Sequence, residues 1–138
     1  MKKVLICGGS GFIGKNVIKY LKSKNYRIVA TYNTKIPKNF SFVKWIKSDL
    51  TFKENVKNTI NNFDIVIQCA AVTSGAKEMI TNPFSLIGDN VVMNSLILKE
   101  VVKKNIKHFI FLSCSVMYHH SNKKLRENQY NPKKKLNK

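Results

Sequence analysis

Four short apolar runs without polar alternation constrain the fold of this chain more than any other feature. They are Val4–Cys7, Ile28–Ala30, Ile65–Ala70 and Phe109–Leu112. Strands buried on both faces have this pattern, because helices cover the two faces of a parallel sheet. A fifth run, Phe42–Ile46, alternates apolar and polar residues and predicts a strand nearer the edge of that sheet.

Segments of helical length lie between these runs, at residues 11–23, 52–62 and 85–104. Their apolar residues recur every three or four positions, which is typical of an amphipathic helix, and Asn105 is a plausible stop for the longest one. The resulting order is β-α-β-β-α-β-α-β. Strands that alternate with helices in this way predict right-handed crossovers and an α/β fold with a doubly wound parallel sheet.

The charge of the chain is strongly positive. Its 138 residues include 25 Lys and Arg against 7 Asp and Glu, which gives a net charge of +18. Such an excess of basic over acidic residues suggests nucleic acid as a partner. However, arginine, the side chain preferred for reading base edges, occurs only as Arg27 and Arg126, and aromatic residues do not interleave with the lysines. The composition therefore argues against nucleic acid and indicates a general attraction for anionic ligands.

No apolar run approaches the length of about 18 residues that a membrane-spanning helix needs. The basic and apolar start of the chain runs into glycines without a signal-peptide cleavage site, so we expect a cytoplasmic protein. The cysteines, Cys7, Cys69 and Cys114, are odd in number and widely spaced. They lack the paired spacing of a zinc site, and we expect free thiols and no metal.

Glycines at three-residue spacing follow the first expected strand, at Gly8, Gly11 and Gly14. One lets the chain turn sharply, one lets the backbone approach a pyrophosphate, and one lets the helix pack close to the sheet. The helix that begins here, at Phe12 and Ile13, offers unpaired N–H groups to phosphates. This pattern predicts a dinucleotide site, and the alternative is a glycine-rich turn without a ligand.

The end of the second expected strand bears on the choice of nicotinamide cofactor. An acidic side chain there would bind the ribose 2′-hydroxyl and select NAD. This chain has Tyr32 or Asn33 at that position, with Lys35 close enough to pair with a 2′-phosphate. The absence of a carboxylate favours NADP. If Lys35 is instead a solvated surface lysine that contacts no cofactor, NAD stays equally open. We therefore expect NAD or NADP as the cofactor.

The sequence GGSGFIG after an N-terminal strand resembles the cofactor fingerprint of the extended short-chain dehydrogenase/reductase family, the NAD-dependent epimerases, dehydratases and reductases of nucleotide sugars. Further matches follow in the family's order. They are Asp49-Leu50 after the third strand, Ala70-Ala71 after the fourth, Asn90 on the long helix, and Phe111–Tyr118 with its serines and tyrosine. Within the family, the residues from Ala70 to Asn90 look most like the GDP-L-fucose synthase group.

The resemblance implies a Rossmann-type doubly wound parallel sheet that is incomplete, with about five strands and without the family's C-terminal half. Residues 1–120 are then an NAD(P)-binding domain. Residues 121–138 are a lysine-rich tail that is truncated before the catalytic helix and the substrate lobe. We expect the dinucleotide to contact Gly8, Gly11, Phe12, Ile13, Gly14, Asn33, Lys35, Asp49, Leu50, Ala70, Ala71 and Asn90.

The family's catalysis uses a serine or threonine, a tyrosine, and a lysine four residues after the tyrosine that lowers its pKa. Aligning Tyr118 with this tyrosine places Cys114, a weak donor, at the hydroxyl position. Ser113 or Ser115 would substitute for it after a small shift, and Ser115 is the catalytic candidate. Tyr130 and Lys134 have the right spacing. The proline between them would break the helix on which the family carries its pair, so this pair does not match convincingly.

The leading hypothesis is therefore the NAD(P)-binding portion of a nucleotide-sugar epimerase, dehydratase or reductase that is not catalytically competent alone. The alternative is a non-catalytic NAD(P)-binding or regulatory module of the same fold. A nucleotide sugar is expected as a partner only if the missing lobe is supplied. The helix at 85–104 is expected to pair subunits, as it does in the family, and the three cysteines are expected near the cofactor, where dinucleotide slows their alkylation.

Overall fold

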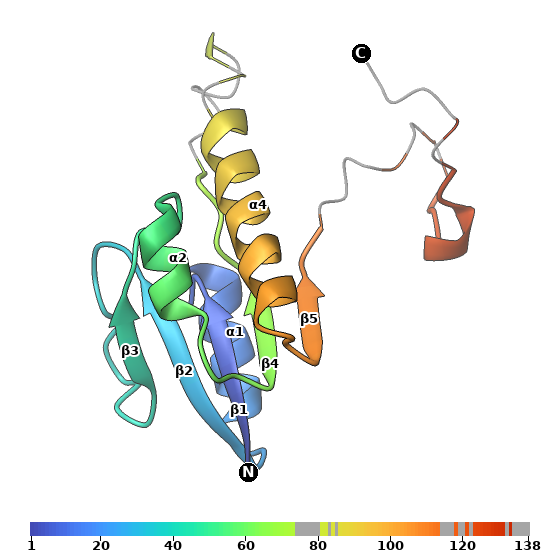
Figure 1. Ribbon diagram of the computed structural model, residues 1–138. Helices are drawn as coiled ribbons and strands as arrows, with labels where there is room; N and C mark the ends of the chain where they lie inside the picture. The colour runs from blue at the N-terminus through green and yellow to red at the C-terminus, as the bar shows by residue number, and fades with distance from the viewer. Residues whose placement is uncertain are drawn as a thin grey trace.

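The computed structural model of this chain describes residues 1–73, 81–82, 84, 86–113, 118, 121, 123–131 and 133. Five parallel strands form one sheet in the order β3-β2-β1-β4-β5 (Figure 1). The elements are β1 (Lys2–Cys7), α1 (Phe12–Leu21), β2 (Tyr26–Tyr32), β3 (Lys44–Lys47), α2 (Lys53–Thr59), β4 (Ile65–Gln68), α4 (Ile87–Lys103), β5 (His108–Phe111) and the 3-10 helix η2 (Glu127–Gln129). The predicted Rossmann-type parallel sheet of five strands is confirmed, and the alternating run forms β3 at one edge. The other edge is β5, which was expected to be buried on both faces but is largely exposed because, within the described part of the chain, no strand or helix covers its outer side.

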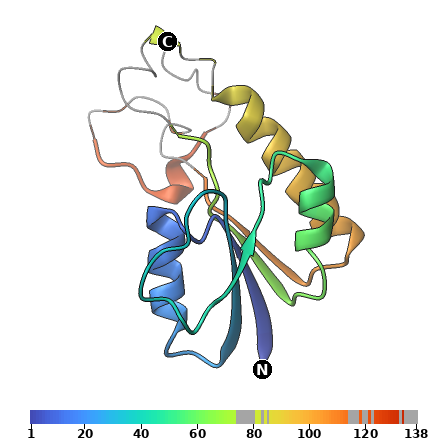
Figure 2. The ribbon, with the colours of Figure 1, turned by 90° about the vertical axis from the view of Figure 1, so that its left-hand side faces the viewer.

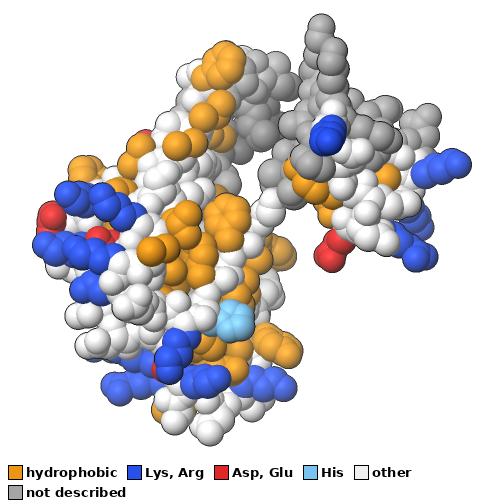
Figure 3. Space-filling model, turned by 45° about the vertical axis from the view of Figure 1, so that its right-hand side comes forward, with side chains coloured by type: hydrophobic (Ala, Val, Ile, Leu, Met, Phe, Trp, Pro, Cys, Tyr) orange, Lys and Arg blue, Asp and Glu red, His pale blue; other side chains and the backbone are white. Residues whose placement is uncertain are grey.

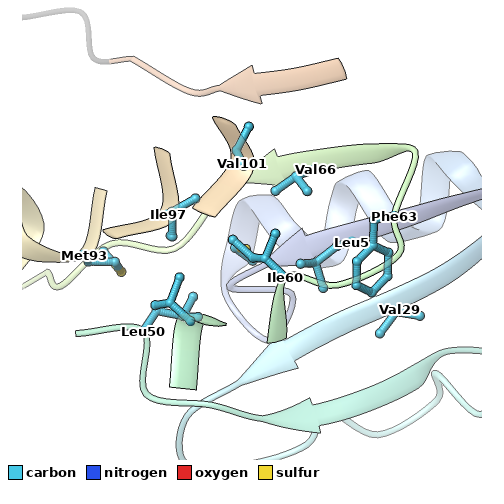
Figure 4. Close-up of a cluster of buried hydrophobic side chains, with 11 residues drawn as sticks. Leu5, Val29, Leu50, Ile60, Phe63, Val66, Met93, Ile97 and Val101 are labelled. Atoms are coloured by element: carbon cyan, nitrogen blue, oxygen red, sulfur yellow. The ribbon is translucent and has the colours of Figure 1, made fainter. Parts of the chain in front are cut away.

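Helices cover the two faces of the sheet unequally. Figure 2 shows α1 on one side and α2 with α4 on the other. Successive side chains of β1 serve both faces, because Leu5 packs towards α2 and α4 whereas Val4 and Ile6 pack towards α1. Figure 4 shows the larger apolar cluster, in which side chains of the central strands meet Ile97 of α4 and Ile60, the residue that follows α2.

Helix α1 packs on the sheet through its second half. Ile18 and Leu21 are buried, and Val17 is partly buried, as the apolar stripe predicts. Ile13 belongs to the same predicted stripe, yet 49% of its surface is exposed. The reason is its position in the first turn, where it lines a cavity at the edge of the sheet instead of a packed face.

Helix α4 lies over β4 with Met93, Ile97 and Val101 buried. The three- or four-residue apolar spacing predicts Val102 on this face as well, which is wrong, because 68% of its surface is exposed, and Glu100 is buried instead. The expected stop is confirmed: α4 ends at Lys103, and Asn105 adopts a left-handed conformation with φ of 51°. Asparagine tolerates this conformation better than most residues, which makes it a favourable helix terminator.

An apolar surface extends over the outer side of α4 and onto β5. Figure 3 shows hydrophobic side chains gathered along these two elements. The exposed large side chains there are Ile87, Val91, Val92, Leu98, Val102, Ile110 and Phe111. Apolar surface of this kind is typical of sites that another protein surface covers. Subunit pairing through α4 stays a prediction. Among the described residues, no helix is both long and apolar enough to cross a membrane.

Candidate functional site

A cavity of about 430 Å3 opens where the parallel strands end. The segments at the carboxyl ends of β1, β2, β3 and β4 line it, together with one side chain of α4. The lining residues are Gly8, Ser10, Gly11, Phe12, Ile13, Thr31, Tyr32, Asn33, Ser48, Asp49, Leu50, Thr51, Cys69, Ala70, Ala71, Val72, Thr73 and Met93. Ligands of doubly wound sheets bind at this edge, which makes the cavity the candidate site.

The turn after β1 depends on glycine at two positions. Gly8 has a φ of +73°, and a Cβ added to it would lie 2.5 Å from Cα of Ala70. Its N–H donates a 2.8 Å hydrogen bond to the buried Oγ1 of Thr31 on β2. A Cβ on Gly14 would collide with the carbonyl oxygen of Gly8 and lie 2.7 Å from Cα of Gly9. The turn packs closely against Ala70, in the segment after β4, and α1 packs closely against the turn. A side chain is therefore excluded at both Gly8 and Gly14.

Gly11 forms the N-terminal cap position of α1 and lines the cavity. The first N–H groups of α1, at Phe12 and Ile13, lack an intrahelical acceptor, as in any helix, and Gly11 has no side chain to cap them. A Cβ added to Gly11 would lie 3.3 Å from the carbonyl oxygen of Gly8. The cavity floor is therefore a main-chain cradle at the positive end of a helix, an arrangement suited to an anion.

Asp49 follows β3 and is the one charged residue among those that line the cavity. Its Oδ1 accepts hydrogen bonds from the N–H of Thr51 at 3.0 Å and from Oγ1 of Thr51 at 2.7 Å. Its carbonyl oxygen accepts a bond from Nδ2 of Asn55 on α2. These contacts hold the carboxylate at the cavity rim, where it can accept a hydrogen bond from a ligand amine.

The segment after β4 is held by a buried amide side chain. Gln68 is 2% exposed, and its Nε2 donates to the carbonyl oxygen of Ala70 at 3.1 Å and to Oδ1 of Asn94 at 2.8 Å. Its Oε1 accepts the N–H of Ala70 at 3.2 Å. Because Asn94 lies on α4, these bonds tie the wall of the cavity to the long helix.

One turn earlier on α4, Asn90 makes a similar connection. Its Oδ1 accepts the N–H of Val72 at 3.0 Å, and its Nδ2 donates to the carbonyl oxygens of Val72 at 2.9 Å and Leu86 at 2.7 Å. Asn90 itself does not line the cavity. Its amide therefore acts on the cavity through Val72, by fixing the backbone that forms the wall.

Two cysteines lie at the carboxyl ends of β1 and β4, as the strand order predicts. Burial, with a smaller contribution from the neighbouring Cys69, raises the pKa of Cys7 to about 12. Burial raises the pKa of Cys69 to about 11, although this side chain is partly accessible and lines the cavity. Both are free thiols that stay protonated at neutral pH. Cys114 lies outside the described residues.

The structure brings most of the predicted cofactor contacts to one cavity. Gly14, Lys35 and Asn90 are outside its lining: Gly14 packs behind the turn, Asn90 braces the wall, and Lys35 is exposed. The catalytic candidate Ser115 lies outside the described residues. The predicted residues that line the cavity are Gly8, Gly11, Phe12, Ile13, Asn33, Asp49, Leu50, Ala70 and Ala71.

Three polar residues that organise the site are not among those predicted from the sequence. Thr31 and Gln68 each interrupt or end an apolar run, and a polar side chain in a buried strand signals a specific hydrogen-bond partner. Asn94 follows Asn90 by four residues, a spacing that places both amides on one side of α4. These two signals identify the positions as special, but their partners lie far away in the sequence.

The tyrosines near the end of the chain contact each other. The rings of Tyr118 and Tyr130 lie edge to face, with centroids 5.7 Å apart. Tyr130 follows η2 and has an extended backbone, with φ of −62° and ψ of 124°. It is therefore not placed on an α-helix, in agreement with the argument against pairing it with Lys134, which lies outside the described residues.

Known proteins with similar structures include 4-epimerases of sugar nucleotides and uronate dehydrogenases. The UDP-Glc/GlcNAc 4-epimerase of Campylobacter jejuni superposes with a TM-score of 0.78 at 22% identity, covering 95% of this chain and 43% of that protein. UDP-glucose 4-epimerase of Bifidobacterium longum, solved with NAD+ and UDP, superposes with a TM-score of 0.71 at 24% identity, covering 84% and 38%. At this identity the likeness establishes the Rossmann-type fold.

Sequence comparison extends the likeness beyond the fold. GDP-L-colitose synthase of Yersinia pseudotuberculosis is 25% identical over 118 residues, which are 84% of this chain and 34% of that protein. GDP-L-fucose synthase of Azorhizobium caulinodans is 28% identical over 85% of this chain and 34% of that protein. This chain thus spans about a third of these relatives. Residues 4–137 match the NAD dependent epimerase/dehydratase family, and the chain belongs to that family.

Proposed function

We propose that this chain binds NAD or NADP in the cavity at the carboxyl edge of the sheet, as the cofactor-binding portion of a nucleotide-sugar epimerase, dehydratase or reductase. The observation that carries this proposal is the main-chain cradle at Gly11 and the start of α1. The pyrophosphate would accept hydrogen bonds from the N–H groups of Phe12 and Ile13, which have no intrahelical acceptor.

The other lining residues fit the remaining parts of a dinucleotide. Oδ1 of Asp49 is engaged by Thr51, and its second oxygen is suited to the exocyclic amine of adenine. Ala70 and Ala71 have small side chains that leave room for a ribose along the wall. Asn33 follows β2 and carries no carboxylate, so no negative charge at this strand end repels a 2′-phosphate, and we propose that the cavity accepts both cofactors.

A bound nicotinamide supplies hydride transfer, and this chain supplies the orientation. Asn90 and Gln68 hold the backbone of the cavity wall, and the glycine turn would hold the phosphates, so these two segments would orient a bound cofactor. We propose that the nucleotide sugar, and with it catalysis, requires the part of the family's length that this chain does not span. A regulatory module that only senses the cofactor is the second candidate, favoured by the extended backbone at Tyr130.

Dinucleotide binding is tested by fluorescence titration with NADH and NADPH. We expect dissociation constants between micromolar and millimolar for the unchanged chain. Gly11→Ala should weaken binding at least tenfold, because its methyl group would occupy the cradle, where only Gly8 O lies near the added atom. The same substitution should change stability little, since Gly11 has a φ of −73° that any residue adopts.

Gly88→Ala on α4 is the matched control, because an added Cβ there meets no atom within 4 Å and lies outside the cavity. It should bind both dinucleotides like the unchanged chain. Failure of the unchanged chain to bind either dinucleotide would refute the proposed function. Equal affinities for the Gly11→Ala and Gly88→Ala variants would instead refute only the placement of the pyrophosphate.

The thiol of Cys69 gives an independent measure of ligand occupancy. A pKa of about 11, against an ordinary value of 9.0, reduces the thiolate fraction at neutral pH by about 100-fold. Alkylation by iodoacetamide should therefore be slow at pH 7 and rise about tenfold per pH unit up to pH 11. Saturating dinucleotide should slow it further, because Cys69 lines the cavity.

Peptide mass spectrometry resolves the labelling of this cysteine from that of the others. The pH series should be recorded on folded protein, with the denatured chain as the reference for an unburied thiol. A labelling rate at Cys69 that equals the denatured rate at pH 7 would contradict the burial argument. A rate unchanged by saturating dinucleotide would contradict the expected shielding.

A further inference from the structure

A second cavity lies at the opposite edge of the sheet, where the strands begin. It has a volume of about 130 Å3 and is formed by β1, β2 and β3 together with the end of α2 and the segment that follows it. Figure 3 shows basic side chains gathered at this end of the molecule. We name it the amino-edge pocket, defined by its lining residues Lys3, Arg27, Val29, Lys44, Ile46, Asn58, Thr59, Asn61 and Phe63.

Three cations of the pocket are placed by the strand register. Lys3 pairs with Arg27 across β1 and β2, and Val29 pairs with Lys44 across β2 and β3. Neighbouring strands are about 4.8 Å apart and two residues span about 6.6 Å, so Lys44 lies roughly 8 Å diagonally from Arg27. Because side chains two apart share a face, all three lie on the α2 side of the sheet, as Val29 does.

The positive charge of this group is incompletely neutralised. Among the described residues, none of the three cations forms a salt bridge with a carboxylate. Asp64 provides a counter-charge beside Lys3, but its Oδ2 accepts the backbone N–H of Lys3 at 2.8 Å. The end of the short helix α2 adds at most roughly half a negative charge. Like charges placed directly opposite each other are unfavourable, so the fold retains a site that an anion would stabilise.

The donors and the size of the pocket define the anion. A cavity of about 130 Å3 is about four times the volume of one water molecule and well below the roughly 300 Å3 of small-molecule sites. It therefore holds one tetrahedral group. The guanidinium of Arg27 matches two phosphate oxygens, Lys44 adds a point charge, and the amides of Asn58 and Asn61 add neutral donors.

Lys3 has its position fixed by a further contact. Its Nζ lies 4.4 Å from the centroid of the Phe63 ring, an arrangement that holds the ammonium group beside the pocket. We propose that the amino-edge pocket binds a single phosphate group, supplied by inorganic phosphate or by a phosphomonoester whose remainder stays outside. This binding is independent of the dinucleotide cavity, which lies at the other edge of the sheet.

A nuclear magnetic resonance titration with inorganic phosphate, at constant ionic strength, tests this proposal on the full chain. The amide signals of Lys3, Arg27 and Lys44 should shift and saturate in the millimolar range. They are resolved from those of Phe12 and Ile13, which report phosphate at the glycine turn. Shifts at the pocket that do not saturate, or that chloride reproduces at the same ionic strength, would overturn the proposal.

Charge-matched variants separate a built site from general attraction. Arg27→Gln combined with Lys44→Gln should raise the dissociation constant for phosphate at the pocket at least tenfold. Lys99→Gln combined with Lys103→Gln removes the same charge from exposed positions on α4 and should change it less than twofold. Equal weakening in both double variants would overturn the proposal. The dissociation constant for phosphate is measured in parallel for Lys44→Gln alone, which keeps Arg27 and perturbs the fold less than the double variant. It should also be raised, by less than in the double variant.

Glycerol 1-phosphate in a parallel titration identifies the source of the group. Binding at least threefold tighter than inorganic phosphate supports a phosphomonoester ligand, whereas equal or weaker binding supports free phosphate. Saturating NADH should leave the phosphate affinity of the pocket unchanged. A chain that binds no dinucleotide but retains the pocket's phosphate affinity would refute the proposed function and still support this site.

Discussion

Gly8→Ala is expected to lower the free energy of unfolding by about 2–5 kcal/mol. Two costs add at this position. An L-residue at a φ of +73° is strained by about 1–2 kcal/mol, and the new methyl group would lie 2.5 Å from Cα and 2.6 Å from N of Ala70. Both contacts are with backbone, so no side-chain rotation relieves them, and the overpacking costs about 1–3 kcal/mol more.

Urea denaturation of the purified chain measures this loss, and thermal unfolding should show a fall in Tm of roughly 10 °C. Gly88→Ala is the matched control, because its added methyl meets nothing within 4 Å. It lies in the first turn of α4, where alanine is favoured over glycine by up to about 1 kcal/mol. A Gly8→Ala variant as stable as Gly88→Ala would contradict the turn geometry after β1.

Gln68→Leu is expected to destabilise the chain by about 2–4 kcal/mol, although leucine is apolar and similar in size. The substitution removes the acceptor of the Ala70 N–H and a donor to both the Ala70 carbonyl and Oδ1 of Asn94. Leaving a buried polar group without a partner costs about 1–3 kcal/mol. The loss should also weaken dinucleotide binding, because Ala70 forms the cavity wall.

A double-mutant cycle with Asn94→Leu tests whether the network, and not side-chain size, produces this effect. Replacing both partners by apolar groups leaves fewer unpaired atoms than replacing one, so we expect a coupling energy of about 1 kcal/mol between positions 68 and 94. Denaturation midpoints of the four chains give this energy. Additive losses would show that the two amides contribute independently and that their 2.8 Å bond has no net effect.

The elements of the fold were predictable because local patterns encode them. Unbroken apolar runs identified the buried strands β1, β2 and β4, and the three-residue glycine spacing identified the turn at Gly8 and Gly14. The run at 109–112 was also expected to be buried on both faces, and this was wrong, because β5 lies at the edge of the sheet with Ile110 and Phe111 exposed. Helix α2 is shorter than the predicted 52–62, ending at Thr59 where Ile60 adopts a ψ of 87°. Ile60, directly after this end, is fully buried in a cluster with residues of β1 and α4, and no local pattern records that packing.

Much of the candidate site was predictable for the same reason. The segments at Gly11, Asp49 and Ala70 each follow a strand, and parallel strands bring their carboxyl ends to one edge. Lys35 was expected beside them, yet it lies outside the cavity lining because the chain leaves β2 at Tyr32 and continues over the surface. Sequence proximity to a strand end does not determine where an exposed side chain lies.

The sequence by itself determined the class of fold, the order of its elements and the glycine turn, because each of these depends on neighbours within a few residues. The tertiary structure alone decided that Gln68 meets Asn94, that Asn90 braces Val72 and that Lys3, Arg27 and Lys44 share one pocket. The residues brought together in this way are 17 to 41 positions apart, and only the register of the strands and the packing of α4 on the sheet bring them together.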